Sequence, residues 1–222
     1  MNSGANAPDA ASSQRFTPAF VQELESLFAW RRDVRHFLTD PIAEPLIDRV
    51  VDAAGTAPSV GLSEPWRFVR VDSDAGRAAV IDNFDRANQD ALAGQADDNA
   101  AQYASLKLAG LREAPVHIAV FCDEATMQGK GLGTATMPEM RRYSVVCAVM
   151  QMWLAARALG LGMGWVSILD PIRLAEDLDV PPDWSLIAYL CLGWPKEDHL
   201  DPELERMGWE CRNRTAGRIL RR

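Results

Sequence analysis

The chain has 222 residues, of which 48% are hydrophobic and 24% charged, proportions that are usual for a globular protein and exclude disordered and fibrous classes. This length suffices for one sizeable core and is short for two, so we expect a single domain over residues 17–222 behind a disordered tail of small polar residues at 1–16. The formal net charge of −8 excludes a broad nucleic-acid surface, which would need clustered Lys and Arg.

Helix and strand signals alternate along the chain. Thr17 before Pro18 marks a helix start, and apolar residues at helical spacing continue this helix to the region of Arg31. A second helix is predicted over 45–54, where Gly55 ends it. The stretch 74–110 is helix-compatible, although 94–99 is too polar and acidic for a core and suits a lid. Further helices are expected from near Pro138 and over 172–178, and the expected strands cover 67–71, 116–122, 165–168 and 186–192. Such interleaving without repeats predicts an α/β arrangement of two or three layers.

Localisation is predicted from the apolar stretches, the N-terminus and the cysteines. The stretch 143–161 resembles a membrane span in hydrophobicity, but Gln151 and Arg157 interrupt it, so we expect a buried core or dimer helix. The first residues lack the basic start and apolar run of a secretory signal. We therefore predict a cytoplasmic protein without membrane or nucleic-acid partners. Its cysteines are widely spaced, show no metal-binding pattern and are expected to be buried thiols: Cys122, Cys147, Cys191 and Cys211.

The first segment with chemical character is RRDVRHF, residues 31–37. Three guanidinium groups, those of Arg31, Arg32 and Arg35, crowd around the single carboxylate of Asp33, which is costly without an anion nearby. Planar guanidinium groups bind phosphate through paired hydrogen bonds, so this segment suits a phosphate or flavin-edge clamp. The alternative is a solvated basic helix end that complements the helix dipole.

Two further segments are rich in Gly, Pro and Ser. In APSVGLSEPWRF, residues 57–68, an irregular backbone offers amides that suit the polar edge of a planar ring system, although an ordinary connecting loop is the alternative. In GLGMGWVSILD, residues 160–170, three glycines precede Trp165 and Ser167. Glycines let a backbone approach a ligand closely, and the alternative here is a tight helix-to-strand turn.

The remaining motifs indicate no further chemistry. QGKGLGT, residues 128–134, matches neither the phosphate-binding GxxxxGK[ST] pattern nor the dinucleotide GxGxxG pattern. The histidines lie far apart in the sequence, and His117, inside an apolar strand, is expected to be a satisfied core residue rather than a metal ligand. The sequence contains no GxSxG elbow, so a hydrolase of that type is not indicated.

Taken in order, RRDVRHF, APSVGLSEPWRF, LKLAGLREAP, GLGTATMPEM and GLGMGWVSILD resemble the nitroreductase superfamily over about Trp30 to Cys211. Asp33 in the first motif and Ser167 in the last resemble the dimethylbenzimidazole synthase branch of that superfamily. The resemblance implies an α+β fold in which helices flank a mostly antiparallel sheet, and an intertwined homodimer with FMN at the interface. Many members carry Asn and Gln where this chain has Leu62 and Glu64, which fits a specialised member.

The residues that this resemblance places around FMN come from four segments. The first motif and the C-terminal region would hold the phosphate and ribityl chain: Arg31, Arg32, Asp33, Val34, Arg35, and Arg212 or Arg214. The Pro-Ser loop would lie near the flavin ring, in this chain or in its partner: Ser59, Gly61, Leu62 and Ser63. A lid segment and the last motif would cover the ring and face its reactive central edge: Leu108, Gly164, Trp165 and Ser167.

In the branch that the chain resembles, reduced FMN is a substrate rather than a recycled cofactor. It reacts with dioxygen, its ribityl chain is cut, and 5,6-dimethylbenzimidazole, the lower ligand of vitamin B12, and erythrose 4-phosphate leave. This cleavage needs a base at the first ribityl carbon, and we expect Asp33 to be that base, with Ser167 orienting the oxygen adduct. A lid over 88–110 would exclude water, and a flavin reductase or reduced nicotinamide would supply the reduced flavin.

Two other functions are compatible with the same motifs. An FMN-dependent NAD(P)H nitroreductase or quinone reductase would recycle its flavin and would need no base beside the sugar chain. A flavin-binding or delivery protein without catalytic activity would use the same phosphate clamp and would need neither Asp33 nor Ser167.

Overall fold

The computed structural model describes residues 16–93, 109–213, 215–219 and 221–222. The tail predicted over 1–16 therefore falls almost entirely outside the described residues. The same is true of Leu108, of Arg214 and of residues 94–108 of the predicted lid.

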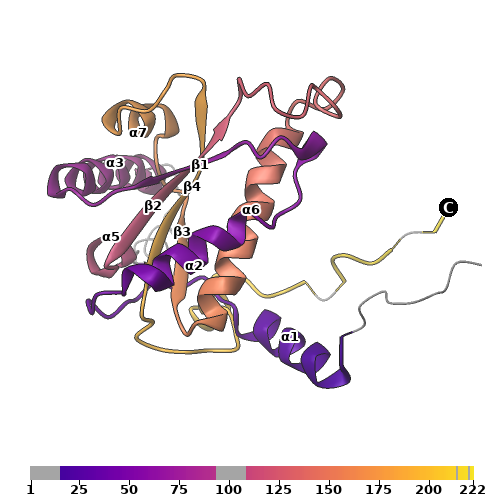
Figure 1. The fold of residues 1–222 in the computed structure, drawn as a ribbon. Helices are drawn as coiled ribbons and strands as arrows, with labels where there is room; N and C mark the ends of the chain where they lie inside the picture. Colours follow the sequence, from indigo (N-terminus) through magenta and orange to yellow (C-terminus); the bar gives the residue numbers. More distant parts are fainter. Residues whose placement is uncertain (1–15, 94–108, 214, 220) are drawn as a thin grey trace, which may run out of the picture.

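A four-stranded antiparallel sheet forms the centre of the molecule (Figure 1). Its strands follow the order β1 (Trp66–Arg70), β2 (Val116–Asp123), β4 (Trp184–Gly193) and β3 (Gly162–Val166). Each neighbouring pair is antiparallel. The two central strands are buried over most of their length, which explains why they stand out in the sequence as short continuous apolar runs.

Helices cover both faces of this sheet (Figure 1). On one face lie α2 (Glu44–Ala54) and α6 (Met140–Ala158), and on the other lie α3 (Asp74–Ala93), α5 (Gly110–Glu113) and α7 (Pro171–Asp177). The structure therefore has three layers and confirms the predicted α+β class with a central antiparallel sheet.

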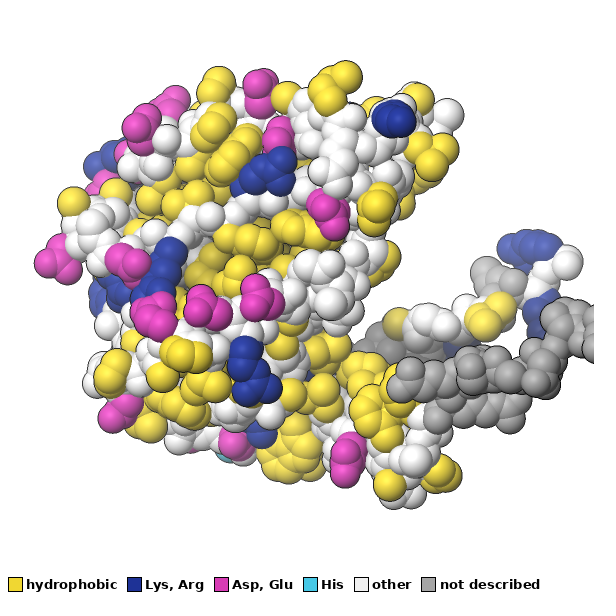
Figure 2. Space-filling view, viewed as in Figure 1, with side chains coloured by type: hydrophobic (Ala, Val, Ile, Leu, Met, Phe, Trp, Pro, Cys, Tyr) yellow, Lys and Arg dark blue, Asp and Glu magenta, His cyan; other side chains and the backbone are white. Residues whose placement is uncertain are grey.

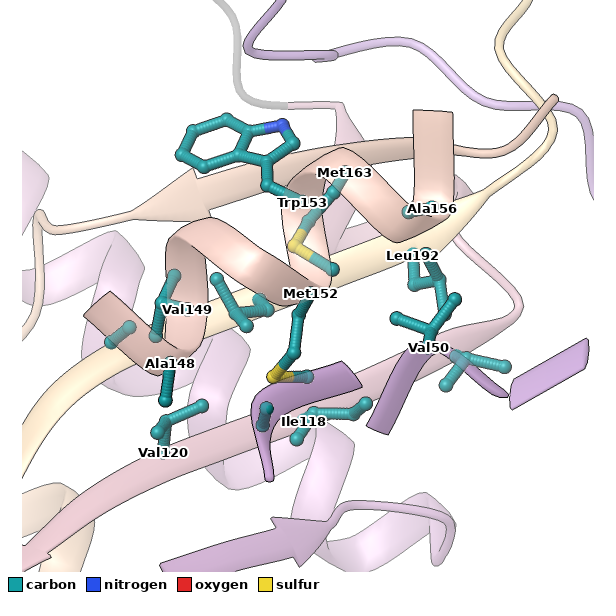
Figure 3. Close-up of a cluster of buried hydrophobic side chains, with 14 of the residues drawn as sticks. Val50, Ile118, Val120, Ala148, Val149, Met152, Trp153, Ala156, Met163 and Leu192 are labelled. Atoms are coloured by element: carbon teal, nitrogen blue, oxygen red, sulfur yellow. The ribbon is translucent and has the colours of Figure 1, made fainter. Parts of the chain in front are cut away.

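Two hydrophobic cores result, one on each side of the sheet. Successive side chains of a strand point to opposite faces, so β2 sends Ile118 and Val120 into the core under α2 and α6, and Ala119 and Phe121 into the core under α3 and α7. Figure 3 shows the first of these cores, in which Met152 of α6 lies above the sheet.

The first helix, α1 (Pro18–Trp30), packs against α6 and has no buried residue. Thr17 caps it as predicted, because its hydroxyl oxygen accepts a hydrogen bond of 3.2 Å from the backbone amide of Phe20. Figure 1 shows α1 and the C-terminal residues extending away from the sheet and its helices. Figure 2 shows exposed hydrophobic side chains along α1 and the C-terminal residues. It also shows such side chains in a hollow between α2 and the segment leading to β1. Phe20 and Phe28 are 40% and 50% exposed. Exposed apolar side chains that gather in this way are typical of an interaction site.

Two sequence expectations need correction. The third strand is β3 (Gly162–Val166) and not 165–168, so Gly162 and Gly164 belong to the strand rather than to a turn before it. Of the four cysteines, Cys122 and Cys191 are buried as expected, whereas Cys147 and Cys211 are exposed.

His117 is a core residue, as predicted, but it is only partly satisfied. It is 1% exposed and its Nδ1 lies 2.9 Å from the hydroxyl of Tyr189, whereas its buried Nε2 has no hydrogen-bond partner among the described residues. In the described part of the chain, no helix combines the length and the hydrophobicity that crossing a membrane requires.

Candidate active site

The segment that holds the three arginines runs along the free edge of β3. Asp33 forms a parallel bridge with Met163, and the backbone amide of Val34 donates a hydrogen bond of 3.0 Å to the Met163 carbonyl. Phe37, fully buried, bridges to Pro195 and fixes the far end of the segment. The segment thus starts at the C-terminal cap of α1, Arg31, and from Asp33 to Phe37 forms an additional irregular edge to the sheet.

Glycines allow this segment to lie so close to the sheet. A Cβ atom at Gly164 would overlap the carbonyl oxygen of Val34, and one at Gly162 would lie 2.8 Å from a methyl carbon of Val34. The glycines of the third motif therefore serve a close approach of two backbone segments, which is a role that glycine commonly has in strands.

Asp33 stands where the edge segment meets β3. Its Oδ1 accepts a hydrogen bond of 2.9 Å from the backbone amide of Trp165, and its Oδ2 lies 3.4 Å from Nε of Arg35. Burial raises the pKa of the Asp33 carboxyl above its ordinary value, while the Trp165 hydrogen bond and the Arg35 charge act in the opposite direction and the charge of Glu203 adds to the rise. The side chain remains 38% exposed, so the carboxylate is accessible from one side.

Three adjoining depressions surround this carboxylate, and each is lined by both Asp33 and Arg35. The largest of the three has a volume of about 180 Å³ and is lined by four arginines and few other polar residues: Arg31, Arg32, Arg35 and Arg212, with Asp33, Pro202, Glu203 and Leu204. The smallest lies between the edge segment and β3 and contains Gly164, Trp165, Val166 and Cys191.

The arginines of the largest depression are differently engaged. Arg32 donates from Nε to the carbonyl of Leu200 at 2.7 Å and from Nη1 to the carbonyl of Arg31 at 2.6 Å, so its guanidinium supports the chain itself. Burial and the positive charges of Arg212 and Arg31 lower its pKa. This crowding of like charges favours an anion in the depression.

Trp153 of α6 was not singled out in the sequence. Its indole Nε1–H donates a hydrogen bond of 3.1 Å to the carbonyl of Arg32, and its ring lies 4.9 Å from the guanidinium carbon of Arg31. In the sequence it is one of many apolar residues of a helix. Its polar ring nitrogen signals that a buried partner exists but does not say which residue that partner is.

The loop between α2 and β1 is separate from the three depressions around Asp33. It contains a short 3-10 turn, η1 (Val60–Leu62), and the Val60 amide donates a hydrogen bond of 3.0 Å to the hydroxyl of Ser144 near the start of α6. Gly61, Leu62 and Glu64 have positive φ angles of 58°, 57° and 42°, a strained backbone that often marks functional sites.

The QGKGLGT motif packs against this loop. A Cβ at Gly61 would lie 3.0 Å from the carbonyl oxygen of Gly129, and a Cβ at Gly129 would lie 2.8 Å from that of Gly61. The side-chain amide of Gln128 donates to the Leu62 carbonyl at 2.8 Å and to the Glu64 carboxylate at 3.0 Å. In the structure this motif supports a neighbouring loop.

The structure brings one group of the predicted site residues together: Arg31, Arg32, Asp33, Val34, Arg35, Gly164, Trp165 and Arg212. The loop residues line none of the three depressions: Ser59, Gly61, Leu62 and Ser63. Ser167 is exposed just beyond the end of β3, one residue after Val166 of the smallest depression. Leu108 and Arg214 lie outside the described residues.

Helix α6 connects these two groups. Ser144 holds the loop, and Trp153 holds the arginine segment. Trp153 lies nine positions after Ser144 in the helix, which corresponds to about 14 Å along the axis. The exposed side of α6 between them carries apolar residues, including Val146 and Met150, which are 39% and 42% exposed.

Comparison with known proteins agrees with this geometry. The model of the Nitroreductase family matches residues 28–194. A 5,6-dimethylbenzimidazole synthase of Rhodospirillum rubrum is 60% identical over 197 residues, which cover 89% of this chain and 93% of the relative. A 5,6-dimethylbenzimidazole synthase of Rhodobacter capsulatus is 46% identical over 187 residues, covering 84% and 90%.

Among solved structures, that of iodotyrosine deiodinase bound to FMN and 3-iodo-L-tyrosine has the same fold. Its TM-score is 0.68 at 22% sequence identity, with 79% of this chain and 91% of that chain covered. The sequence match extends over most of the chain and the fold agrees throughout the same region. The chain belongs to the nitroreductase family and, within it, to the branch of the 5,6-dimethylbenzimidazole synthases.

Proposed function

We propose that this protein is a 5,6-dimethylbenzimidazole synthase, an oxidoreductase that uses dioxygen to fragment reduced FMN. The fragmentation releases 5,6-dimethylbenzimidazole and erythrose 4-phosphate, together with the remaining atoms of the flavin pyrimidine ring. The observation that carries the proposal is the Asp33 carboxylate, held by the Trp165 amide at the edge of an arginine-lined depression. The identity of 60% to a synthase along nearly the whole chain supports the same reaction.

The arginine-lined depression fits the phosphate end of FMN. Arg31, Arg35 and Arg212 line it and present guanidinium groups, while Arg32 is engaged by the carbonyls of Leu200 and Arg31 and contributes charge. A phosphate dianion would relieve the repulsion among these groups, because charge-assisted hydrogen bonds to phosphate are strong where water is partly excluded. The reacting part of the substrate then lies beyond Asp33, toward Gly164 and Trp165.

Asp33 has the properties of a general base for the ribityl chain. Its Oδ1 is fixed by a backbone amide, its side chain is reachable from the depression, and its raised pKa makes it a better proton acceptor than an ordinary carboxylate. Ser167, exposed at the end of β3, is proposed to hydrogen-bond at the reactive edge of the ring and to orient the oxygen adduct.

The second half of the site is proposed to come from the partner in a homodimer. A two-fold axis across the exposed side of α6 would place the start of one α6 beside the second half of the other. The Ser59–Ser63 loop of one chain would then reach the arginine segment of its partner. Two observations support this arrangement: α6 rises about 14 Å between Ser144, which contacts the loop, and Trp153, which contacts the arginine segment, and its exposed side is apolar.

The test is the Asp33→Asn variant, supplied with chemically reduced FMN in air. We expect it to bind FMN and to lose at least about a hundredfold of the 5,6-dimethylbenzimidazole formation, since an amide cannot accept the proton. Mass spectrometry of the product and flavin fluorescence measure the two effects. Asp72→Asn, which removes a carboxylate that pairs with Arg70 at 2.8 Å on the surface, is the matched control and should form product normally.

The same assay separates the competing functions. Undiminished product from Asp33→Asn would remove Asp33 from the mechanism. NADH oxidation with a quinone acceptor and full recovery of intact flavin would contradict the proposal and favour a nitroreductase or quinone reductase. Return of all FMN unchanged without NADH oxidation would favour a flavin-binding protein.

A further inference from the structure

Trp153 connects three parts of the site that lie far apart in the sequence. Its Nε1–H is hydrogen-bonded to the carbonyl of Arg32, its ring face lies 4.9 Å from the guanidinium carbon of Arg31, and its ring centroid lies 6.3 Å from that of Trp165. The side chain is 7% exposed, and Figure 3 shows its indole on the other side of α6 from Met152. It therefore points toward the arginine segment rather than into the middle of the core.

The Trp153 ring is positioned to hold the Arg31 guanidinium in place. Arg31 lines the same depression as Arg32 and Arg212, so groups of like charge are its neighbours. Arg32 is fixed by the carbonyls of Leu200 and Arg31, whereas for Arg31 the partner recorded among the described residues is the Trp153 ring. An aromatic face attracts a guanidinium group and, being flat, leaves the N–H groups at its edge available to another acceptor.

The indole N–H acts on the backbone next to these side chains. The Arg32 carbonyl lies between the end of α1 and the bridge that Asp33 forms with Met163, so it precedes the catalytic carboxylate by one residue. The hydrogen bond of 3.1 Å from Trp153 fixes this carbonyl. One side chain thus restrains both the Arg31 guanidinium and the main chain that leads to Asp33.

We infer that Trp153 is a positioning residue that holds Arg31 toward the phosphate group of the substrate, which makes it a determinant of selectivity for FMN over riboflavin. The inference rests on the proposed function, because it requires a phosphate-bearing flavin in the arginine-lined depression. Trp153 acts through Arg31 and does not touch the reacting atoms.

The experiment compares the dissociation constants of FMN and riboflavin in wild type, Trp153→Phe and Trp153→Leu. Phenylalanine keeps a smaller aromatic face and loses the N–H, while leucine loses both. We expect the preference for FMN over riboflavin to fall about threefold in Trp153→Phe and about tenfold in Trp153→Leu, the latter corresponding to about 1.4 kcal/mol. Riboflavin affinity should change little, since riboflavin has no phosphate.

The double variants with Arg31→Ala show whether the effect passes through Arg31. In that background, replacing Trp153 should leave the FMN preference unchanged, because the group that it holds is gone. Trp194→Phe is the matched control, since the Trp194 indole also donates to a main-chain carbonyl, that of Pro41 at 3.4 Å, and packs against the same core. It should keep the full preference.

Three results would overturn the inference. Equal losses of FMN and riboflavin affinity in Trp153→Phe would indicate a purely structural role for the tryptophan. So would a loss of preference that persists unchanged when Arg31 is already alanine. Equal affinity of the wild-type protein for riboflavin and FMN would show that the depression does not bind the phosphate, which contradicts the proposed function itself. This failure can be told apart from a failure of the inference because it is seen before any residue is substituted. If Trp153→Leu fails to fold, the Trp153→Phe series decides alone.

Discussion

The Asp33 carboxyl is tuned by neighbours that act in opposite directions. Burial and the charge of Glu203 raise its pKa, and the Trp165 amide and Arg35 lower it. Glu203 lies on the short helix α8 (Glu203–Arg206) and lines two of the depressions that contain Asp33. The proton affinity of the proposed base therefore depends on a residue 170 positions further along the chain.

We predict that Glu203→Gln shifts the acidic limb of the pH profile of kcat/KM to lower pH. Removal of the negative charge lowers the Asp33 pKa, so the base stays ionised at a pH where the wild-type carboxyl is already protonated. The measurement is the rate of 5,6-dimethylbenzimidazole formation against pH.

Glu205→Gln is the matched control for this prediction, because it removes the same charge from the same helix at a residue that lines none of the three depressions around Asp33. Its profile should coincide with that of wild type. An unchanged acidic limb in Glu203→Gln would show that Asp33 protonation does not govern that limb.

At the level of residues, the sequence predicted the arginine segment and Asp33 because unusual charge crowding is visible in RRDVRHF itself. It did not predict that the Arg32 guanidinium donates a hydrogen bond to the Leu200 carbonyl. Nor did it predict that Trp153 contacts the Arg31 guanidinium and the Arg32 carbonyl. Such contacts depend on how α6 crosses the edge segment. The hydrogen bond between Asp33 and Trp165 spans 132 residues and has no local signal in the sequence.

Among the structural elements, the loop that contains η1 and the QGKGLGT segment support each other. Their backbones approach so closely at Gly61 and Gly129 that neither position has room for a Cβ atom. The approach holds Leu62 and Glu64 in the left-handed region, where a side chain is disfavoured. The pair of glycines thus stabilises the strained conformation of the loop that we propose to contact the flavin ring.

We predict that Gly129→Ala lowers the free energy of unfolding by about 3 kcal/mol, since the new methyl group adds steric overlap with Gly61 to the cost of a positive φ. Gly131→Ala is the matched control: its φ of +76° is similar and no atom lies within 4 Å of the added Cβ. It should cost only about 1 kcal/mol. Urea denaturation measures both, and equal losses would show that the close approach contributes nothing.

Element types were predicted well because apolar runs and helix start signals are local. The helix at Thr17, the helix ending at Gly55 and the two central strands were all confirmed. The third strand was displaced because its glycines resemble a turn in the sequence. Only the packing of Val34 against Gly162 and Gly164 shows that these glycines serve a strand.

For the whole molecule, the proposed dimer has a consequence that a mixing experiment can detect. If the loop acts on the partner chain, two inactive variants, Arg35→Ala and Gly61→Ala, should complement each other after subunit exchange. A mixed dimer then contains one site with both halves intact, so statistical mixing should recover about a quarter of wild-type activity.

Each variant carried alone through the same exchange is the control and should stay inactive. Absence of recovery in the mixture, with mixed dimers demonstrated by mass spectrometry, would place the loop and the arginine segment of one site in the same chain and would contradict the proposed arrangement.

If the partner chain covers the exposed helix α1 in the proposed homodimer, folding of this helix depends on assembly. It has 13 residues and buries none of them in the single chain, a length at which an isolated helix is only marginally stable in water. Arg31 follows directly at its C-terminal cap. Dilution of the protein below its association range should therefore unwind this helix and release the first arginine of the phosphate clamp, so that flavin affinity itself becomes dependent on protein concentration.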